Sequence, residues 1–167
     1  MECGVETKYT RQLIQGLSIL VVDGNSYMRR LTRMMLTNLG AKNVYEAPDS
    51  LAALEVVRTF DPDVMVLNWN MPILSGLELL RIIRSPGLFP RPDLPIIMLS
   101  DCARRSQVTE ALRSGVHEFL VRPTSAAALE GRLLSIAAKP RKMVQLGHFY
   151  VPQPRRMPKM IESEAAA

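Results

Sequence analysis

The chain has 167 residues, of which 47% are hydrophobic and 22% are charged, and its formal net charge is +5. This length accommodates one well-packed domain with short extensions and excludes two domains of ordinary size. The sequence contains no apolar run of about 18 residues and no secretion-type N-terminus, so we expect a cytoplasmic protein without a membrane span.

The positive charge is concentrated in the C-terminal tail, residues 139–167. Six basic residues occur there against Glu162 and Glu164, namely Lys139, Arg141, Lys142, Arg155, Arg156 and Lys159. The rest of the chain is therefore nearly neutral, which makes a dedicated nucleic-acid-binding domain an unfavoured interpretation. Binding of nucleic acid through the basic tail stays open as an alternative, and it predicts a steep dependence on salt.

Residues 1–16 form an N-terminal extension, and strand and helix patterns alternate after it. Apolar runs predict strands at residues 17–22, 64–67, 95–99 and 118–121, and residues 43–47 are a short strand candidate. Helical patterns follow each of them, at residues 27–39, 51–60, 77–84, 103–114 and 125–138. The first helix has an apolar stripe of Leu31, Met34, Met35 and Leu39. Strands that are apolar throughout are buried on both faces, which predicts an α/β fold with a parallel sheet between two helical layers.

Small polar residues follow the predicted strands where a parallel α/β sheet places its functional crevice, beyond the carboxyl ends. They are Asp23 and Gly24 after the first strand, Asn68, Trp69 and Asn70 at the third, Ser100 and Asp101 at the fourth, and Arg122 and Pro123 after the fifth. We therefore predict that these residues converge on one pocket.

The run from residue 17 to residue 138 resembles the receiver domain of bacterial two-component response regulators, the family that includes the chemotaxis regulator. The resemblance rests on the acid after strand one, on Asn70-Met71-Pro72 followed by Ser75-Gly76, on Ser100, and on the pair Arg122-Pro123. It implies a flavodoxin-like (βα)5 three-layer sandwich, with a parallel five-stranded sheet in the order 2-1-3-4-5.

The resemblance also assigns roles position by position. Members of the family bind Mg²⁺ with an acidic pair after strand one, with the phosphoacceptor aspartate after strand three, and with a backbone carbonyl two residues further on. In this chain the acidic pair is Asp23-Gly24, the acceptor position is Asn68, and the carbonyl belongs to Asn70. Two of the three carboxylates are therefore missing.

Further family positions fall on residues near the last two strands. The hydroxyl after strand four corresponds to Ser100, the lysine after strand five to Arg122, and the aromatic switch residue to Phe119. Phe119 lacks a phenolic hydroxyl and is interpreted as core more than switch. The bond between Arg122 and Pro123 corresponds to the family's cis peptide.

These departures predict a degenerate receiver, or pseudo-receiver, with no intact catalytic residue and no enzyme activity. Mg²⁺ needs carboxylates to replace its water, so with Asp23 and the Asn70 carbonyl as residual ligands we expect it to bind weakly or not at all. A neutral amide at Asn68 is also a poor nucleophile toward phosphorus. We expect Asp23 and Arg122 to form an ion pair bridged by Asn68.

A conventional phosphoacceptor receiver, in which Asn68 stands for an engineered or deamidated aspartate, remains the alternative. The missing second acid at Gly24 speaks against a single substitution of that kind.

The tail after residue 138 is too short for a DNA-binding output domain, and its prolines predict an extended segment. Phe149 and Tyr150 suit a docking segment or an arm that folds back, although a plain solvated tail is the favoured interpretation. The chain is then expected to act by binding a sensor histidine kinase, a phosphotransfer protein, another regulator or a second copy of itself. The family's usual contact face corresponds to residues 103–138, with Arg104, Arg105, Val108, Leu112 and Phe119 as candidates.

Overall fold

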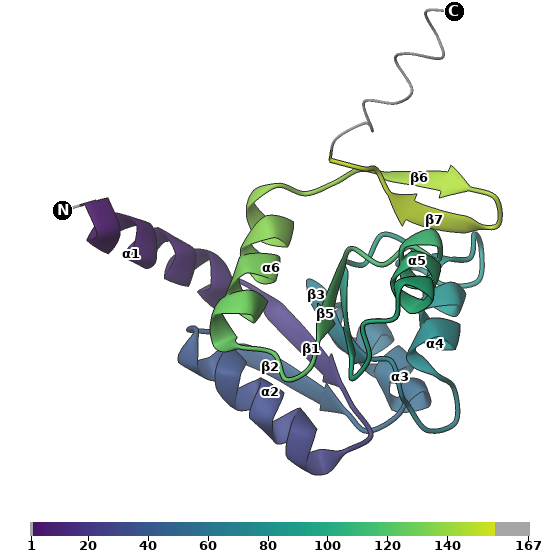
Figure 1. The fold of residues 1–167 in the computed structure, drawn as a ribbon, viewed down its shortest axis with the longest axis horizontal. Coiled ribbons are helices and arrows are strands. Elements are labelled where there is room, and N and C mark those ends of the chain that lie inside the picture. Colours follow the sequence, from purple (N-terminus) through teal and green to yellow (C-terminus); the bar gives the residue numbers. More distant parts are fainter. Residues whose placement is uncertain (1, 156–167) are drawn as a thin grey trace, which may run out of the picture.

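The computed structural model describes residues 2–155, which form six helices and seven strands (Figure 1). The helices are α1 (Glu2–Gln15), α2 (Ser26–Asn38), α3 (Ser50–Phe60), α4 (Gly76–Arg84), α5 (Arg105–Arg113) and α6 (Ala126–Ala138). The strands are β1 (Ser18–Val22), β2 (Asn43–Ala47), β3 (Val64–Asn68), β4 (Ile96–Ser100), β5 (Glu118–Val121), β6 (Met143–Leu146) and β7 (Phe149–Pro152).

Strands β1 to β5 form one parallel sheet in the order β2-β1-β3-β4-β5, which confirms the predicted fold class. The register aligns Val22 of β1 with Leu67 of β3, and Asn68 with Leu99 of β4. Because all five strands run the same way, the ends of β1, β3, β4 and β5 meet at one edge of the sheet. We call this edge the carboxyl edge, and the opposite one the amino edge.

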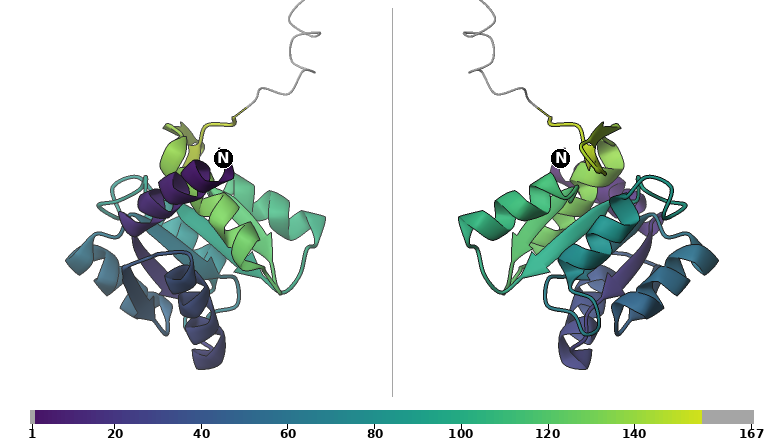
Figure 2. Two further views of the ribbon diagram at one scale, coloured as in Figure 1. Left: turned by 90° about the vertical axis from the view of Figure 1, so that its left-hand side faces the viewer. Right: turned by 90° about the vertical axis from the view of Figure 1, so that its right-hand side faces the viewer.

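Helices cover both faces of the sheet, and each face has its own apolar core (Figure 2). Leu20 and Val22 of β1 pack toward α3, α4 and α5, whereas Ile19 and Val21 pack toward α2, α6 and the end of α1. This alternation follows from the two-residue period of a strand. It explains why the central strands β1, β3 and β4 are apolar at nearly every position.

Helix caps fix the loops at the carboxyl edge. The side chain of Asn25 accepts hydrogen bonds from the backbone N–H groups of Tyr27 and Met28 and begins α2. Ser75 and Glu78 form a capping box at the start of α4. Helix α5 begins at Arg105, two residues later than predicted, and Arg104 at its N-cap provides no side-chain hydrogen bond to it.

The N-terminal extension is helical, which the sequence interpretation did not specify. Helix α1 projects from one side of the molecule, and its C-terminal end packs against α6 (Figure 1). Ile14 is 1% exposed and belongs to the core that also contains Leu129 and Leu133 of α6. Ile14 thus anchors the C-terminal end of this helix in the receiver core.

The prediction of a plain extended tail is wrong for residues 143–152, which form the antiparallel hairpin β6–β7. The two-residue turn Gly147-His148 connects the strands, and Gly147 has a φ of 61°. Such a turn suits a right-twisted hairpin. Val151 is 7% exposed, so the arm folds back on the body. The rest of the predicted tail, residues 156–167, lies outside the described residues.

Gly115 provides a close backbone contact between the body and the hairpin. It lies between α5 and β5 with a φ of 98°, and a Cβ atom there would be 2.3 Å from the carbonyl oxygen of Tyr150. Figure 1 shows the hairpin beside the end of α5. Only a residue without a side chain allows the hairpin backbone to approach this closely.

Candidate functional site

A crevice of about 520 Å³ opens at the carboxyl edge of the sheet. Its walls come from the ends of β1, β3, β4 and β5 and from the loop before α4. The lining residues are Asp23, Gly24, Asn25, Met28, Asn68, Asn70, Pro72, Asp101 and Arg122. Six of the residues predicted to converge there are among them, and sequence reasoning did not select Asn25, Met28 or Pro72 for the pocket.

Arg122 and Asp23 form the predicted ion pair across this crevice. The Nη1 atom of Arg122 donates to Oδ2 of Asp23 at 2.9 Å. Their side chains are only 8% and 3% exposed, respectively, so water screens the attraction poorly. The pair joins residues 99 positions apart in the sequence and connects β1 to β5.

Asn68 completes the network with both ends of its amide, as the sequence hypothesis stated. Its Oδ1 accepts from Nη2 of Arg122 at 2.9 Å. Its Nδ2 donates to the carbonyl oxygen of Asn70 at 2.9 Å and to Oδ1 of Asp23 at 3.4 Å. An aspartate here would have no N–H to donate, so the amide fits this network better than a carboxylate would.

Asp101 is a second carboxylate on Arg122. Nε of Arg122 donates to Oδ1 of Asp101 at 2.9 Å, and Asp101 is 64% exposed. The sequence placed one carboxylate opposite one guanidinium, and this contact corrects that count to two carboxylates. The position of Asp101 directly after β4, next to β5 in the sheet, is the signal that could have revealed the contact.

Backbone donors and a neighbouring arginine hold Asp23 in place. The N–H of Asn25 donates to Oδ1 of Asp23 at 2.9 Å, and Nη1 of Arg29 donates to the carbonyl oxygen of Asp23 at 2.7 Å. Asp23 is therefore bound from α2, β3 and β5 together.

Gly24 occupies a position that has no room for a side chain. A Cβ atom at residue 24 would lie 2.8 Å from Cδ of Pro72. An acid at this position would require the loop that contains Pro72 to move. The missing second carboxylate is thus matched by a loop that packs against the glycine backbone.

The residues present do not fit a Mg²⁺ ion. The oxygens that would bind it, from Asp23, Asn68 and Asn70, already accept hydrogen bonds from the protein. The cationic Arg122 guanidinium binds the side-chain oxygens of Asp23 and Asn68 and would repel a divalent cation. In the described part of the chain, no group of three His, Cys, Asp or Glu residues is arranged to hold a metal ion.

Three predicted pocket residues lie outside the crevice lining, which corrects their assignment. Trp69 points to the opposite face from Asn68 and packs edge-on against Phe119, with ring centroids 6.4 Å apart. The hydroxyl oxygen of Ser100 accepts from the N–H of Cys102 at 3.2 Å. Pro123 is exposed, and the bond before it is cis, as the resemblance implied.

The predicted contact face is only partly open. Arg104 and Arg105 are exposed, and Val108 and Phe119 are half-buried. Leu112 is 51% exposed, but it lines a groove of about 490 Å³ together with Val144 and Leu146 of the hairpin. The hairpin thus covers part of the C-terminal end of α5, where a partner would bind.

The order of the sheet, the face-alternating core and the polar crevice at the carboxyl edge define a receiver-type signalling domain. Residues 19–134 match the family described as the response regulator receiver domain. The chain belongs to this family, whose members act in bacterial two-component signalling and are not classical enzymes.

Similar proteins include chemotaxis regulators from two bacteria. The chain is 39% identical over 121 residues to chemotaxis protein CheY-3 of Vibrio cholerae, covering 72% of this chain and 92% of that protein. It is 36% identical over 120 residues to chemotaxis protein CheY of Pseudomonas aeruginosa, covering 72% and 95%. The Francisella response regulator 1452 receiver domain superposes with a TM-score of 0.67 at 27% identity, covering 74% and 98%.

None of the helices within residues 2–155 combines the length and the apolar character that a membrane span requires.

Proposed function

We propose that this protein is an atypical receiver that acts in the cytoplasm by binding other proteins, without phosphorylation of an aspartate and without Mg²⁺. The observation that supports this proposal is the network of Arg122, Asp23 and Asn68. In it, the protein's own guanidinium occupies the oxygens that a metal ion would need. The Arg122 guanidinium already places a positive charge where a metal ion would provide one.

The chemistry at residue 68 supports the same proposal. Phosphoryl transfer to a receiver requires an anionic oxygen that attacks phosphorus, with a cation that neutralises the transferred group. Asn68 has a neutral amide oxygen, and that oxygen already accepts from Arg122 at 2.9 Å. This arrangement supports a receiver that is not phosphorylated at residue 68.

The partner is proposed to be a protein of the same signalling class: a sensor histidine kinase, a phosphotransfer protein, another regulator or a second copy of this chain. The N-terminal end of α5, with Arg104, Arg105 and Val108, lies outside the groove that Leu112 forms with Val144 and Leu146 of the hairpin. Two cations next to a half-buried apolar side chain suit a partner surface with an acidic rim and an apolar centre.

The test is to incubate the purified chain with Mg²⁺ and acetyl phosphate and to measure its intact mass. Chemotaxis protein CheY-3 of Vibrio cholerae, treated identically, is the comparison for phosphodonor quality. We expect no phosphoryl adduct on this chain, and the same mass confirms that residue 68 is asparagine. An adduct that disappears in the Asn68→Ala variant would establish the conventional alternative and refute the proposal.

A further inference from the structure

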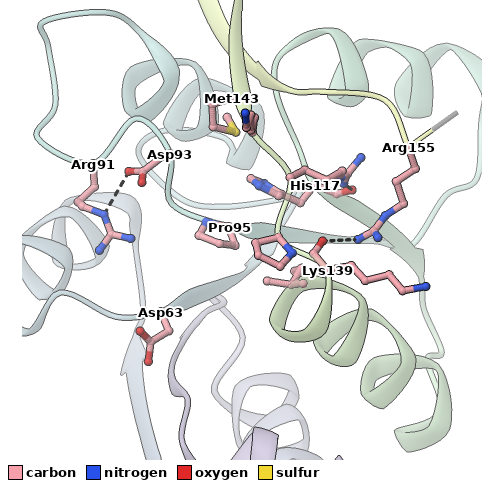
Figure 3. Close-up of a pocket in the computed structure, with 12 residues that line it drawn as sticks. Asp63, Arg91, Asp93, Pro95, His117, Lys139, Met143 and Arg155 are labelled. Carbon is pink, nitrogen blue, oxygen red and sulfur yellow. Dashed lines mark hydrogen bonds and ion pairs between the residues drawn. The ribbon is translucent and has the colours of Figure 1, made fainter. Parts of the chain in front are cut away.

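A second pocket lies at the amino edge of the sheet, opposite the crevice. It has a volume of about 390 Å³ and lies between the starts of β3, β4 and β5, the end of α6, and residues 139–143 and 155 of the C-terminal segment (Figure 3). Its volume is within the range of small-molecule sites. Neither the proposed function nor the family assignment uses this pocket.

The pocket has an excess of positive charge. Five cationic side chains and two carboxylates line it: Arg91, Lys139, Arg141, Lys142 and Arg155 against Asp63 and Asp93. Both carboxylates already have partners. Oδ2 of Asp63 accepts from the N–H and the hydroxyl of Ser18 at 2.8 and 3.0 Å, and Asp93 accepts from Nε of Arg91 at 3.3 Å.

Lys139 and Lys142 are the cations that remain available. Both are exposed at the rim, and within residues 2–155 neither ammonium group has an ion-pair partner. Arg155 donates from Nη2 to the carbonyl oxygens of Ser135 and Lys139 at 2.7 and 3.2 Å, which holds it at the end of α6. Figure 3 shows Arg155 and Lys139 on one side of the pocket and Arg91 with Asp93 on the other.

His117 adds a neutral donor between these two sides. Its Nδ1 accepts from the N–H of Ile96 at 3.3 Å and lies 3.1 Å from Nη2 of Arg84, so its ring proton is on Nε2. The ring is 6% exposed and belongs to the pocket lining. Burial, together with Arg84, Arg141 and Arg155, lowers the pKa of His117 to about 2, so the ring stays neutral.

The two walls of the pocket limit the size of the ligand that can bind in it. The N-terminal ends of three strands form one wall and the C-terminal segment forms the other, so the enclosed volume of about 390 Å³ suits a small ligand. Cations from separate segments can bind separate anionic groups of one molecule. Pro95, Ile136 and Met143 provide apolar surface beside them.

We propose that this pocket binds a small molecule with two or more phosphate groups, and that such a ligand fixes the C-terminal segment against the amino edge. Its phosphates would contact Lys139 and Lys142, with Arg141, Arg155 and the Nε2–H of His117 as further donors. A second binding site would thus exist on the side of the molecule opposite the degenerate phosphoacceptor position.

Calorimetric titration of the full chain with sodium tripolyphosphate tests the proposal, and inorganic phosphate serves as the single-anion comparison. We expect saturable binding of tripolyphosphate and clearly weaker binding of phosphate. The Lys139→Gln/Lys142→Gln variant should bind tripolyphosphate roughly tenfold more weakly or worse, because two charge-assisted contacts are lost.

The matched control is Arg30→Gln/Lys42→Gln, which removes the same charge from two exposed positions outside the pocket. Its affinity for tripolyphosphate should change by no more than about twofold, since exposed charges at a distance are screened. Equal losses in the two variants, or no binding by the unaltered chain at low-millimolar tripolyphosphate, would overturn the proposal.

Nuclear magnetic resonance of the ¹⁵N-labelled chain identifies the bound region. The proposal requires tripolyphosphate to shift the amide signals of residues 117 and 139–143. Shifts centred on residues 23–25, 101 and 122 would assign the anion to the crevice and refute it.

Discussion

At the scale of single residues, the crevice depends most on Asp23, because this buried carboxylate is bound from three other elements. We expect Asp23→Ala to lower the free energy of unfolding by about 3 kcal/mol, since it leaves the buried Arg122 guanidinium without its buried anion. Urea unfolding at neutral pH measures the change.

Asp101→Ala is the matched control, because it removes the exposed carboxylate on the same guanidinium. Its effect should be below about 1 kcal/mol. If both variants lost equal stability, the buried pair would not be the stabilising element of the crevice.

The burial of His117 makes the free energy of unfolding depend on pH, and stability falls as the pH falls. The lowered pKa of this ring, about 2 against 6.5, means that the unfolded chain takes up a proton before the folded one. The contribution of His117 is therefore complete above pH 6.5 and is lost as the pH falls toward 2. Protonation of His117 changes the free energy of unfolding by at most about 1.4 kcal/mol per pH unit.

The test is to measure urea unfolding between about pH 7 and pH 5 for the unaltered chain and for His117→Asn. The amide oxygen of the asparagine can accept the hydrogen bond from the N–H of Ile96 in place of Nδ1. The variant should lose less stability over this interval, because it has no ring to protonate. Parallel stability curves for the two proteins would show that His117 does not cause the dependence.

Residues at the site show what the sequence could and could not predict. The pairing of Asp23, Asn68 and Arg122 was predictable because the ends of parallel strands converge and the charges were complementary. Trp69 was misplaced because strand alternation turns it away from its neighbour Asn68. His117 was assigned no role, since its contacts with Arg84 and Ile96 arise only when separate segments meet.

At the scale of elements, the hairpin β6–β7 depends on the absence of a side chain at Gly115. Gly115→Ala would place a Cβ atom 2.3 Å from the carbonyl oxygen of Tyr150, at a φ of 98° that alanine rarely adopts. We expect the hairpin to move away and the free energy of unfolding to fall by about 1–3 kcal/mol. Hydrogen exchange of the amides in residues 143–152 should become faster.

Gly131→Ala is the control, because residue 131 lies in helix α6 and its Cβ atom would meet no neighbouring atom within 4 Å. This substitution should leave hairpin exchange unchanged and stabilise the helix by about 0.5–1 kcal/mol. Unchanged exchange in Gly115→Ala would mean that the hairpin does not depend on this contact.

The elements differ in how well the sequence predicts them. Strands β1, β3 and β4 were clear because both of their faces are covered, and apolar side chains therefore occur at nearly every position. The predicted stripe of α2 was half right: Met35 and Leu39 pack against the core, but Leu31 and Met34 are 38% and 61% exposed. The fully buried Leu36 was not part of the prediction. The hairpin was missed because prolines suggested an extended tail, although Gly147 between two short apolar runs was a turn signal.

At the scale of the whole molecule, the two edges of the sheet have different electrostatic character. At the carboxyl edge, the protein's own ion pairs use the carboxylates of the crevice. At the amino edge, the C-terminal segment adds cations to a pocket in which both carboxylates already have partners. The basic tail that the sequence interpretation treated as solvated is, up to residue 155, part of the body.

The central claim is that the crevice works without metal and without a phosphoryl group, and a Mg²⁺ titration tests it. Trp69 is an indirect reporter, because its ring packs on Phe119 outside the crevice lining. Trp69 is next to Asn68 in the chain and is the only tryptophan. We would titrate the folded protein with Mg²⁺, first alone and then with beryllofluoride, and record Trp69 fluorescence. The account predicts no saturable change, whereas saturation at low-millimolar Mg²⁺ or below would show that the crevice binds the metal and would contradict it.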